Sequence, residues 1–326
     1  MALKKLIACT LFMGAMISSC SCASPSSYTF VVAQDGSGNF RTIQQAIDSC
    51  RAYPEWRYHI FIKNGVYREK VDIPSWKTNI TLEGEDVDRT IIVYDDYTGK
   101  TDGRGRVIGT FTSFTCRIAG NNCIVENITF INAAGRVGQG VAIHAEGDRC
   151  VFRRCKFLGN QDTVFASGED SRQYYADCFI EGTTDFIFGG ATAVFERCTI
   201  KSKTNSFITA ASTLPARPYG FVFLHCTLVA DNEVTQVYLG RPWRSHAYTA
   251  FINCTLGGHI RPEGWHPWDK PNPEKTVRYM EYHNTGPGAT VSGRVAWSRQ
   301  LTAGEAATLT VHNVLSGCDH WDPLQP

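Results

Sequence analysis

Two aspartates, Asp162 and Asp185, carry the most informative chemistry of this sequence. Asp162 directly follows Gln161, and Asp185 directly precedes Phe186. If the interval between them makes one turn of a stacked β-coil, the two carboxylates lie on neighbouring turns, roughly 4.8 Å apart. Two carboxylates at that distance do not both ionise readily, so the pair retains a proton and offers an acid and a nucleophile at neutral pH. This chemistry suits hydrolysis. The plainer interpretation is that both aspartates only cap turns.

A repeated strand pattern would position these carboxylates. Each copy is a short strand in which a cysteine and the residue two positions later face one side. The copies start at unequal intervals of roughly 20 to 28 residues, which is typical of a solenoid whose turns differ in loop length. The pattern predicts an all-β fold, a right-handed single-stranded parallel β-helix; a β-sandwich is the alternative, but its strands recur every ~8 to 12 residues. The copies are marked by Cys155, Cys178, Cys198, Cys226 and Cys254.

The open ends of a solenoid need caps. Residues 42–47 read Thr-Ile-Gln-Gln-Ala-Ile and predict a short N-terminal capping helix, opened by a capping box between Thr42 and Gln45. A second small helix is expected from Gly304 onward. Because no Pro- or Ser-rich linker interrupts the repeats, residues 24–326 are predicted to form a single domain.

Residues 1–23 have the composition of an export signal. Two lysines are followed by an apolar stretch that is too short to span a membrane, and then by small residues. The tetrapeptide that ends at Cys20 resembles a bacterial lipoprotein box and predicts a lipid on Cys20 that tethers the protein to a membrane. The alternative is ordinary cleavage after Ala23. We therefore expect an exported protein, either a periplasmic or outer-membrane lipoprotein of a bacterium or a secreted one.

Charge and cysteine content narrow the choice of partners. The 326 residues include 32 basic and 31 acidic side chains, a balance that gives no reason to expect nucleic acid as a partner.

Ten cysteines follow the signal, and neighbouring turns bring Cα atoms within disulfide range, so a Cys178–Cys198 disulfide is predicted. There is no Cys-x-x-Cys and no His-x-x-x-His, so neither a metal nor another cofactor is expected. We expect a monomer.

Seven motifs, in order along the chain, resemble those of the pectin methylesterase family. They are GVYRE at 65–69, QGVA at 139–142, QDTV at 161–164, DFIFG at 185–189, LGRPW at 239–243, GWHPW at 264–268 and EYHNTGPGA at 281–289. The resemblance covers nearly everything after the signal. It implies a pectinesterase with the β-helix fold, which hydrolyses galacturonate methyl esters in pectin (homogalacturonan). The family commonly has Leu-Arg where this chain has Ile143-His144, and Leu in place of Val164, which puts the sugar contacts beside Gln139 in doubt.

The resemblance also implies a role for each polar site residue. Asp185 is the expected nucleophile, and Asp162 the acid that protonates methanol and then the base that activates water. The amides of Gln139 and Gln161 are expected to stabilise the oxyanion as neutral donors. Arg241 is expected to contact Asp185 and keep it ionised and oriented.

Phe186, Trp243 and Trp265 are predicted to contact sugar, because pyranose rings stack their apolar faces on aromatic side chains. Other functions remain open. A polysaccharide lyase would need acidic Ca²⁺ ligands, and a galacturonase would need carboxylates set for glycosidic cleavage. A non-catalytic polysaccharide-binding β-helix and a related hydrolase for a different ester are further alternatives. A serine esterase is disfavoured because the chain has no Gly-x-Ser-x-Gly.

Overall fold

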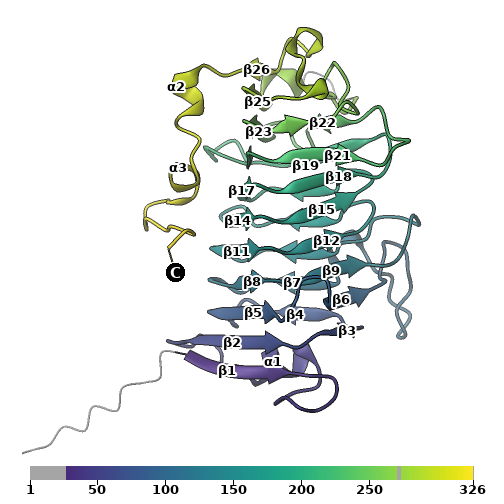
Figure 1. Ribbon diagram of the computed structural model, residues 1–326, viewed down its shortest axis with the longest axis vertical. Coiled ribbons are helices and arrows are strands. Elements are labelled where there is room, and N and C mark those ends of the chain that lie inside the picture. The colour runs from purple at the N-terminus through teal and green to yellow at the C-terminus, as the bar shows by residue number, and fades with distance from the viewer. Residues whose placement is uncertain (1–26, 270–272, 326) are drawn as a thin grey trace, which may run out of the picture.

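The chain winds into a stack of turns, each built from up to three short strands (Figure 1). The computed structural model describes residues 27–269 and 273–325. Strands at equivalent positions of successive turns pair in parallel and form three sheets of eleven, eight and seven strands, here called sheets A, B and C. This architecture confirms the predicted right-handed parallel β-helix.

The strands and helices have the following bounds. Sheet A contains β1 (Ser27–Val32), β2 (Arg57–Ile62), β5 (Ile80–Gly84), β8 (Ile124–Glu126), β11 (Cys150–Arg153), β14 (Arg172–Ala176), β17 (Thr192–Glu196), β20 (Phe221–Leu224), β23 (Tyr248–Ile252), β25 (Arg278–Tyr282) and β26 (Arg299–Gln300). Sheet B contains β3 (Gly65–Tyr67), β6 (Thr90–Tyr94), β9 (Thr129–Asn132), β12 (Lys156–Leu158), β15 (Phe179–Gly182), β18 (Thr199–Ser202), β21 (Thr227–Ala230) and β24 (Thr255–Leu256). Sheet C contains β4 (Val71–Ile73), β7 (Cys116–Ile118), β10 (Ile143–Ala145), β13 (Val164–Ala166), β16 (Ile187–Gly189), β19 (Phe207–Ala211) and β22 (Tyr238–Gly240). The α-helices are α1 (Ile43–Ser49), α2 (Ala303–Ala306) and α3 (Val311–Leu315), and single 3₁₀ turns are η1 (Thr110–Thr112), η2 (Pro273–Lys275), η3 (Pro287–Ala289) and η4 (Val291–Gly293).

The corner between sheets A and B explains the cysteine repeat. The residue before each repeat cysteine has a left-handed backbone, as in Arg154 (φ 50°), Asp177 (φ 53°) and Arg197 (φ 51°). This conformation turns the chain sharply, so that the next side chain points into the core. The strand register stacks these positions turn upon turn. The cysteines therefore form one buried column.

Cys178 and Cys198 are neighbours in this column, yet both are free thiols. The predicted disulfide between them is therefore not formed. Parallel strands hold equivalent Cβ atoms roughly 4.8 Å apart, whereas a disulfide requires about 3.5–4.5 Å. The thiols contact backbone oxygens instead, with Cys178 Sγ 3.3 Å from the carbonyl of Ala176 and Cys198 Sγ 3.5 Å from that of Tyr175.

A second column, of aromatic rings, fills the core along sheet A. Tyr175 stacks at 4.6 Å on both Phe152 and Phe195, and Phe195 stacks at 4.6 Å on Phe223. All four side chains are fully buried. Because a slip of one residue would move each ring to the outer face, this column fixes the register of the turns.

The helix α1 covers the N-terminal end of the stack (Figure 1). The Thr42 half of the predicted capping box is confirmed, since Thr42 Oγ1 accepts from the amide of Gln45 at 3.3 Å. The amides of Ile43 and Gln44 donate instead to Glu69, at 2.9 and 3.0 Å. Glu69 therefore satisfies helix N–H groups that would otherwise have no acceptor.

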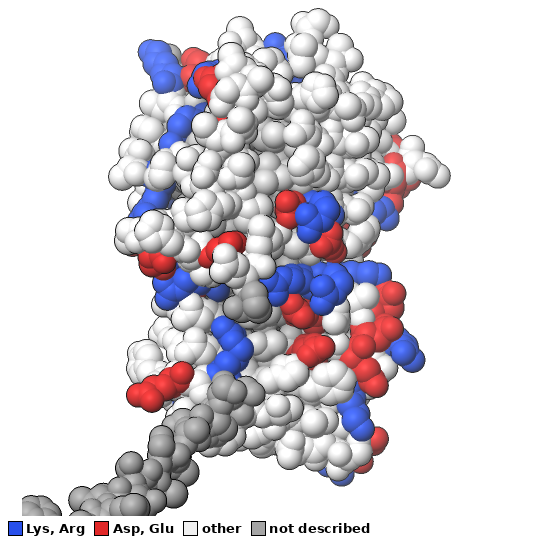
Figure 2. Space-filling view, turned by 60° about the vertical axis from the view of Figure 1, so that its left-hand side comes forward, with Lys and Arg blue, Asp and Glu red and all other residues white. Residues whose placement is uncertain are grey.

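The chain after β26 runs back along the outer face of sheet A through α2 and α3 (Figure 1). The helix α2 confirms the helix predicted near Gly304. Beyond α3, Asp319 forms ion pairs with Arg149 at 2.7 Å and with Arg172. On the face drawn in Figure 2, basic and acidic side chains lie next to one another, in keeping with the balanced composition.

The export signal predicted at residues 1–23 and the lipidation site predicted at Cys20 lie outside the described residues. Within residues 27–269 and 273–325, none of the helices has the length and apolarity that crossing a bilayer requires.

Candidate active site

The strand register places Asp162 and Asp185 side by side. Val164 of β13 pairs with Ile187 of β16, so the residues two positions earlier, Asp162 and Asp185, occupy equivalent places on neighbouring turns. Both aspartates have left-handed backbones, with φ of 68° and 50°, a conformation that Asp tolerates better than most residues. The two carboxylates line one hollow on the outside of sheet C. The adjacency predicted from their spacing in the sequence is confirmed.

Arg241 holds Asp185 in a fixed orientation. It follows β22, which lies two turns beyond β16 in the stack, and it donates from Nε to Oδ1 of Asp185 at 3.0 Å and from Nη2 to Oδ2 at 2.7 Å. Its guanidinium lies between the rings of Phe207 and Trp268, 4.0 and 3.9 Å from their centroids. Two rings and two hydrogen bonds leave the guanidinium little freedom to turn. Asp185, only 5% exposed, is thus presented in one orientation.

Burial and charge give the two carboxylates different protonation. Burial, and then the negative charge of Asp185, raise the pKa of Asp162 to about 8, and Arg241 opposes this only partly. Burial also leaves the pKa of Asp185 above its ordinary value, although the hydrogen bonds and charge of Arg241 offset part of that rise. Because Arg241 contacts Asp185 directly, the proton shared by the pair resides on Asp162 at neutral pH.

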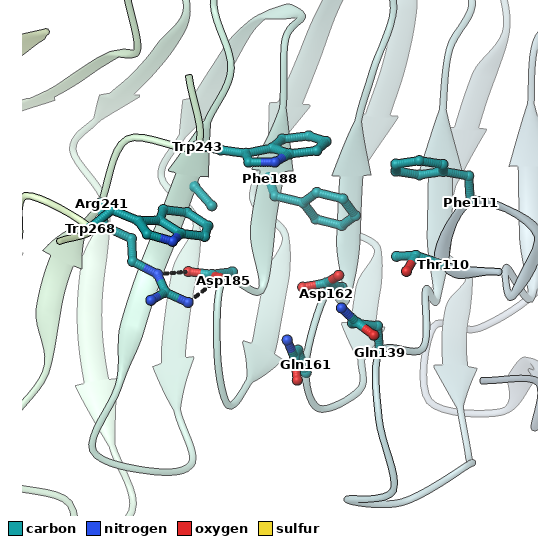
Figure 3. A pocket seen from close by; sticks show the side chains of 11 residues that line it. Thr110, Phe111, Gln139, Gln161, Asp162, Asp185, Phe188, Arg241, Trp243 and Trp268 are labelled. Carbon is teal, nitrogen blue, oxygen red and sulfur yellow. Dashed lines mark hydrogen bonds and ion pairs between the residues drawn. The ribbon is translucent and has the colours of Figure 1, made fainter. Parts of the chain in front are cut away.

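Gln139 and Gln161 form a pair beside the carboxylates. They are joined by a parallel β-bridge between neighbouring turns, and the amide of Gly140 donates to the carbonyl of Gln161 at 3.0 Å. Figure 3 shows their side chains on one side of Asp162 and Asp185, with aromatic rings on the other. Their amide groups are therefore available as neutral donors to an oxygen bound next to Asp185.

The hollow that contains these groups has a volume of about 190 Å³ and is largely aromatic on one side (Figure 3). Trp243 lies in it, as predicted. Five further side chains line the hollow and were not predicted from the sequence. These are Thr110, Phe111, Phe188, Ala210 and Trp268.

Phe186 and Trp265, both predicted to contact sugar, are core residues instead. The left-handed backbone of Asp185 turns Phe186 inward, where it is fully buried and packs so closely under Gly182 that a Cβ there would lie 2.2 Å from the Cβ of Phe186. Trp265 is 1% exposed, stacks on Tyr279 at 4.2 Å and donates from Nε1 to a buried glutamate at 3.3 Å. Neither side chain lines the hollow.

Strand alternation beyond the turn could have identified Phe188. After the turn at Asp185, Phe186 and Ile187 both face the core, so alternation along β16 from Ile187 places Phe188 on the outer face. Trp268 belongs to the same GWHPW motif as Trp265, and only the loop geometry decides between them, since Trp268 has φ of 59°. Among the described residues, no three His, Cys, Asp or Glu side chains converge as metal ligands.

Comparison with known proteins identifies the family of this chain. A family model described as pectinesterase matches residues 29–318. The chain belongs to the pectinesterase family. Pectinesterase 31 of Arabidopsis thaliana is 39% identical over 289 residues, which cover 86% of this chain and 90% of that relative. Other relatives named pectinesterase/pectinesterase inhibitor are longer, and the chain spans about half of their length.

Solved structures of the pectinesterase family share the fold. The pectin methylesterase from carrot has a TM-score of 0.81 and 35% identity, covering 88% of this chain and 93% of that one. A variant pectin methylesterase crystallised in complex with a hexasaccharide has a TM-score of 0.81 and 29% identity, covering 91% and 98%. The resemblance seen in the sequence motifs is thus confirmed over nearly the whole described chain.

Proposed function

We propose that this pectinesterase hydrolyses galacturonate methyl esters of pectin through Asp185 and Asp162. The observation that carries the proposal is that two adjacent carboxylates differ in protonation. Asp185 is held by two hydrogen bonds from Arg241 and stays ionised, whereas Asp162 retains a proton. One residue can therefore attack while the other donates.

The proposed reaction runs in two steps. A carboxylate oxygen of Asp185 bonds to the ester carbon, and the carbonyl electron pair moves onto oxygen, where the amides of Gln139 and Gln161 donate to it. The oxyanion then collapses, the bond to the methoxy group breaks, and Asp162 gives its proton to the departing methanol. In the second step Asp162 accepts a proton from water as the water attacks the acyl carbon, which releases the free galacturonate and regenerates both aspartates.

The hollow suits a sugar polymer better than a compact ester. It opens onto the long outer face of sheet C, and Trp243 and Phe188 offer ring faces for pyranose stacking. A compact ester would use only the part of this surface next to the carboxylates. The polymer is therefore the proposed substrate.

The test measures methanol release from highly methylated pectin and follows the length of the polymer at the same time. Hydrolysis of acetylated pectin and of a simple aryl ester is measured for comparison. We expect methanol without chain shortening, and little turnover of the other two esters. Chain shortening would indicate a lyase or a galacturonase instead.

Asp185→Asn and Asp162→Asn should each lower turnover by about 10³-fold. Asp177→Asn is the matched control, because Asp177 also has a left-handed backbone and a two-bond contact with an arginine, Arg197, but lies outside the hollow. A folded Asp185 or Asp162 variant that kept more than about a tenth of wild-type turnover, worth only ~1.4 kcal/mol of barrier, would disprove its role.

We also infer that the protein is exported, since residues 1–23 have the composition of a signal and its proposed substrate is a cell-wall polymer. We do not propose a lipid on Cys20, because a relative of 39% identity and a matching structure of 35% identity come from plants, whereas the predicted lipidation is bacterial. N-terminal sequencing of the exported protein tests this. We expect a mature chain that begins at Ser24. A mature chain that begins at a modified Cys20 would instead support the lipoprotein interpretation.

A further inference from the structure

A hollow on the outer face of sheet A shares no lining residue with the catalytic hollow. It has a volume of about 310 Å³ and lies between the strands β2, β8 and β11 and the chain that follows α3. Arg57, the first residue of β2, lines it. We propose that Arg57 binds the carboxylate of an acidic sugar unit in this hollow. The choice of galacturonate as that sugar rests on the proposed function, which yields galacturonate units with free carboxylates.

Arg57 is a half-buried cation without a counter-ion among the described residues. Burial lowers the pKa of its guanidinium, and no carboxylate in the part of the chain that the structure describes opposes this effect. A cation that is withdrawn from water is costly when it lacks a counter-ion. A bound anion would therefore stabilise Arg57 in its present position.

The edge of the Arg57 guanidinium that suits a carboxylate best is open. Nη1 donates to the carbonyl of Asn122 at 2.9 Å and to Oγ1 of Thr81 at 3.4 Å, so the guanidinium is held in place. No acceptor among residues 27–269 and 273–325 is bonded to Nε or Nη2. Elsewhere in this protein the same edge binds a carboxylate with two parallel hydrogen bonds, the strong arrangement for these two groups. Examples are Arg241 with Asp185, Arg294 with Glu281 and Arg197 with Asp177.

Two other arginines line the hollow, but carboxylates of the protein already balance their charges. Arg149 lies 2.7 Å from Asp319, and Arg153 lies 2.9 Å from Glu126. Of these three guanidinium groups, that of Arg57 is the one that can bind a ligand carboxylate without first giving up a partner.

Bonds within the protein hold the walls of this hollow. Arg153 donates from Nη2 to the carbonyl of Pro323 at 2.6 Å, and Asp319 fastens the same segment to Arg149. Pro323 is buried. The segment after α3 is therefore fixed against sheet A, and binding does not have to order it.

The remaining groups of the hollow suit a sugar ring that carries the carboxylate. Trp321 lines the hollow, and pyranose rings pack their apolar faces on aromatic side chains. Oδ1 of Asn122 accepts from Nε of Arg149 at 2.6 Å, which leaves Nδ2 of Asn122 for a sugar hydroxyl. Gln325 adds a second side-chain amide. A cation, an aromatic ring and neutral amides are together the groups that a uronate requires.

One acidic residue, Asp322, also lines the hollow. Its Oδ1 accepts from the amide of Leu324 at 3.0 Å. The negative charge of Asp322 opposes a bound carboxylate, so Arg57 and Asp322 should influence the same ligand in opposite directions. A general effect of protein charge would not depend on these two positions.

The position of this hollow separates attachment from cleavage. The hollow of Arg57 lies on sheet A, whereas the catalytic carboxylates lie on sheet C. A de-esterified stretch of polymer bound at Arg57 leaves the catalytic hollow open to another stretch. The enzyme would thus stay attached to polymer that is already de-esterified while it cleaves further esters.

The test follows hydrogen–deuterium exchange by mass spectrometry as fully de-esterified trigalacturonate is added. Peptides from residues 316–325 report on the hollow of Arg57, and peptides that contain Asp162 or Asp185 report on the catalytic hollow. We expect both sets to be protected in the wild type. In Arg57→Gln the concentration that half-protects residues 316–325 should rise about tenfold, or ~1.4 kcal/mol, with no change at the catalytic peptides. Arg57→Lys should raise that concentration less, and Asp322→Asn should lower it.

Arg51→Gln is the matched control, because Arg51 is an exposed arginine outside the hollow and its loss changes the net charge equally. It should change neither set of peptides. Acetate and inorganic phosphate should protect residues 316–325 only at concentrations about tenfold higher than trigalacturonate, or ~1.4 kcal/mol. In Arg57→Gln, kcat/KM for short methylated oligomers should stay at the wild-type value, which also shows that this variant is folded.

The proposal is overturned if trigalacturonate does not protect residues 316–325 of the wild type, or if it protects them equally in Arg57→Gln. It is also overturned if Arg51→Gln loses protection to the same extent, if Asp322→Asn weakens binding, or if acetate or phosphate protects as well as trigalacturonate. If no pectin yields methanol but the protection depends on Arg57, the proposed function fails and the site on sheet A stands. If methanol is released but residues 316–325 are not protected, the proposed function stands and this site fails.

Discussion

Replacing Arg241 by Gln removes the positive charge that faces Asp185 and leaves the rest of the site in place. In the wild type two hydrogen bonds of 3.0 and 2.7 Å join the pair, and Asp185 is only 5% exposed. Without Arg241, burial alone acts on this carboxylate and raises its pKa further. We expect Asp185 to become protonated at neutral pH and to lose its nucleophilic oxygen.

The size of the effect follows from the burial of the pair. Removing one partner of a buried ion pair costs about 3–5 kcal/mol, because the other charge is left uncompensated. At about 1.36 kcal/mol for each factor of ten, turnover at pH 7 should fall by about 10²- to 10⁴-fold. Part of the lost activity should return as the pH rises, because a higher pH ionises the unpaired Asp185.

The assay is methanol release from methylated pectin between pH 5 and 9, with circular dichroism to confirm that each variant is folded. Arg241→Lys is the matched variant. It keeps a positive charge but loses the two-bond geometry and the stacking between Phe207 and Trp268. We expect it to lie between wild type and Arg241→Gln, with a smaller shift of the acidic limb of the pH profile.

Two results would refute this reasoning. If Arg241→Gln kept turnover within tenfold of wild type at pH 7, Arg241 would not be needed to ionise or orient Asp185. If turnover fell strongly but the pH profile kept its position, Arg241 would act by contacting substrate rather than through Asp185.

Other predictions concern Asp162, the two glutamines and the two tryptophans. Because burial raises the pKa of Asp162 from 3.8 to about 8, its contribution favours the fold most at low pH and is lost as the pH rises toward 8. Asp162→Asn should therefore be more stable than wild type, by a difference in the free energy of unfolding that grows from pH 4 to pH 8 to the order of a few kcal/mol. Thermal scans that show the same difference in unfolding temperature at every pH would contradict this. Gln139→Ala and Gln161→Ala should each lower kcat by about 10²- to 10³-fold and change product binding little, and a raised KM with unchanged kcat would make that glutamine a substrate-positioning residue. Trp265→Ala should lower the free energy of unfolding by about 3–5 kcal/mol, whereas Trp243→Ala should raise KM with little loss of stability; denaturant titration and steady-state kinetics separate the two.

The sequence predicted the parts of the site that follow from the repeat. One turn of the repeat separates Asp162 from Asp185, and nearly the same interval separates Gln139 from Gln161, so the parallel turns place the members of each pair side by side. The LGRPW motif that contains Arg241 allowed its contact with Asp185 to be predicted. These predictions need only the length of chain in a turn, which sequence spacing records directly.

Backbone torsions decide which aromatic side chains line the hollow, and the spacing of residues in the sequence does not reveal these torsions. The left-handed Asp185 turns the chain so that Phe186 and Ile187 both face the core, and Phe188 then lines the hollow. Thr110 and Phe111 come from a loop inserted between β6 and β7, which has no counterpart in the repeat pattern. The disulfide prediction failed for a related reason, since Cα spacing alone does not show that the Cβ vectors of stacked turns run parallel.

The C-terminal segment changes how this stack can come apart. In a simple solenoid each turn touches only its neighbours, so the end turns can fray one at a time. Here the chain leaves the last turn at β26 and is fastened through Asp319 to Arg172 of β14 and to Arg149, beside β11, both many turns earlier. Unfolding of the last turns would break the ion pairs that Asp319 makes with the middle of the stack, and unfolding of the middle turns would detach the C-terminal segment. The segment therefore links distant turns into one cooperative unit, and the turns that carry the catalytic carboxylates lie within the span it closes.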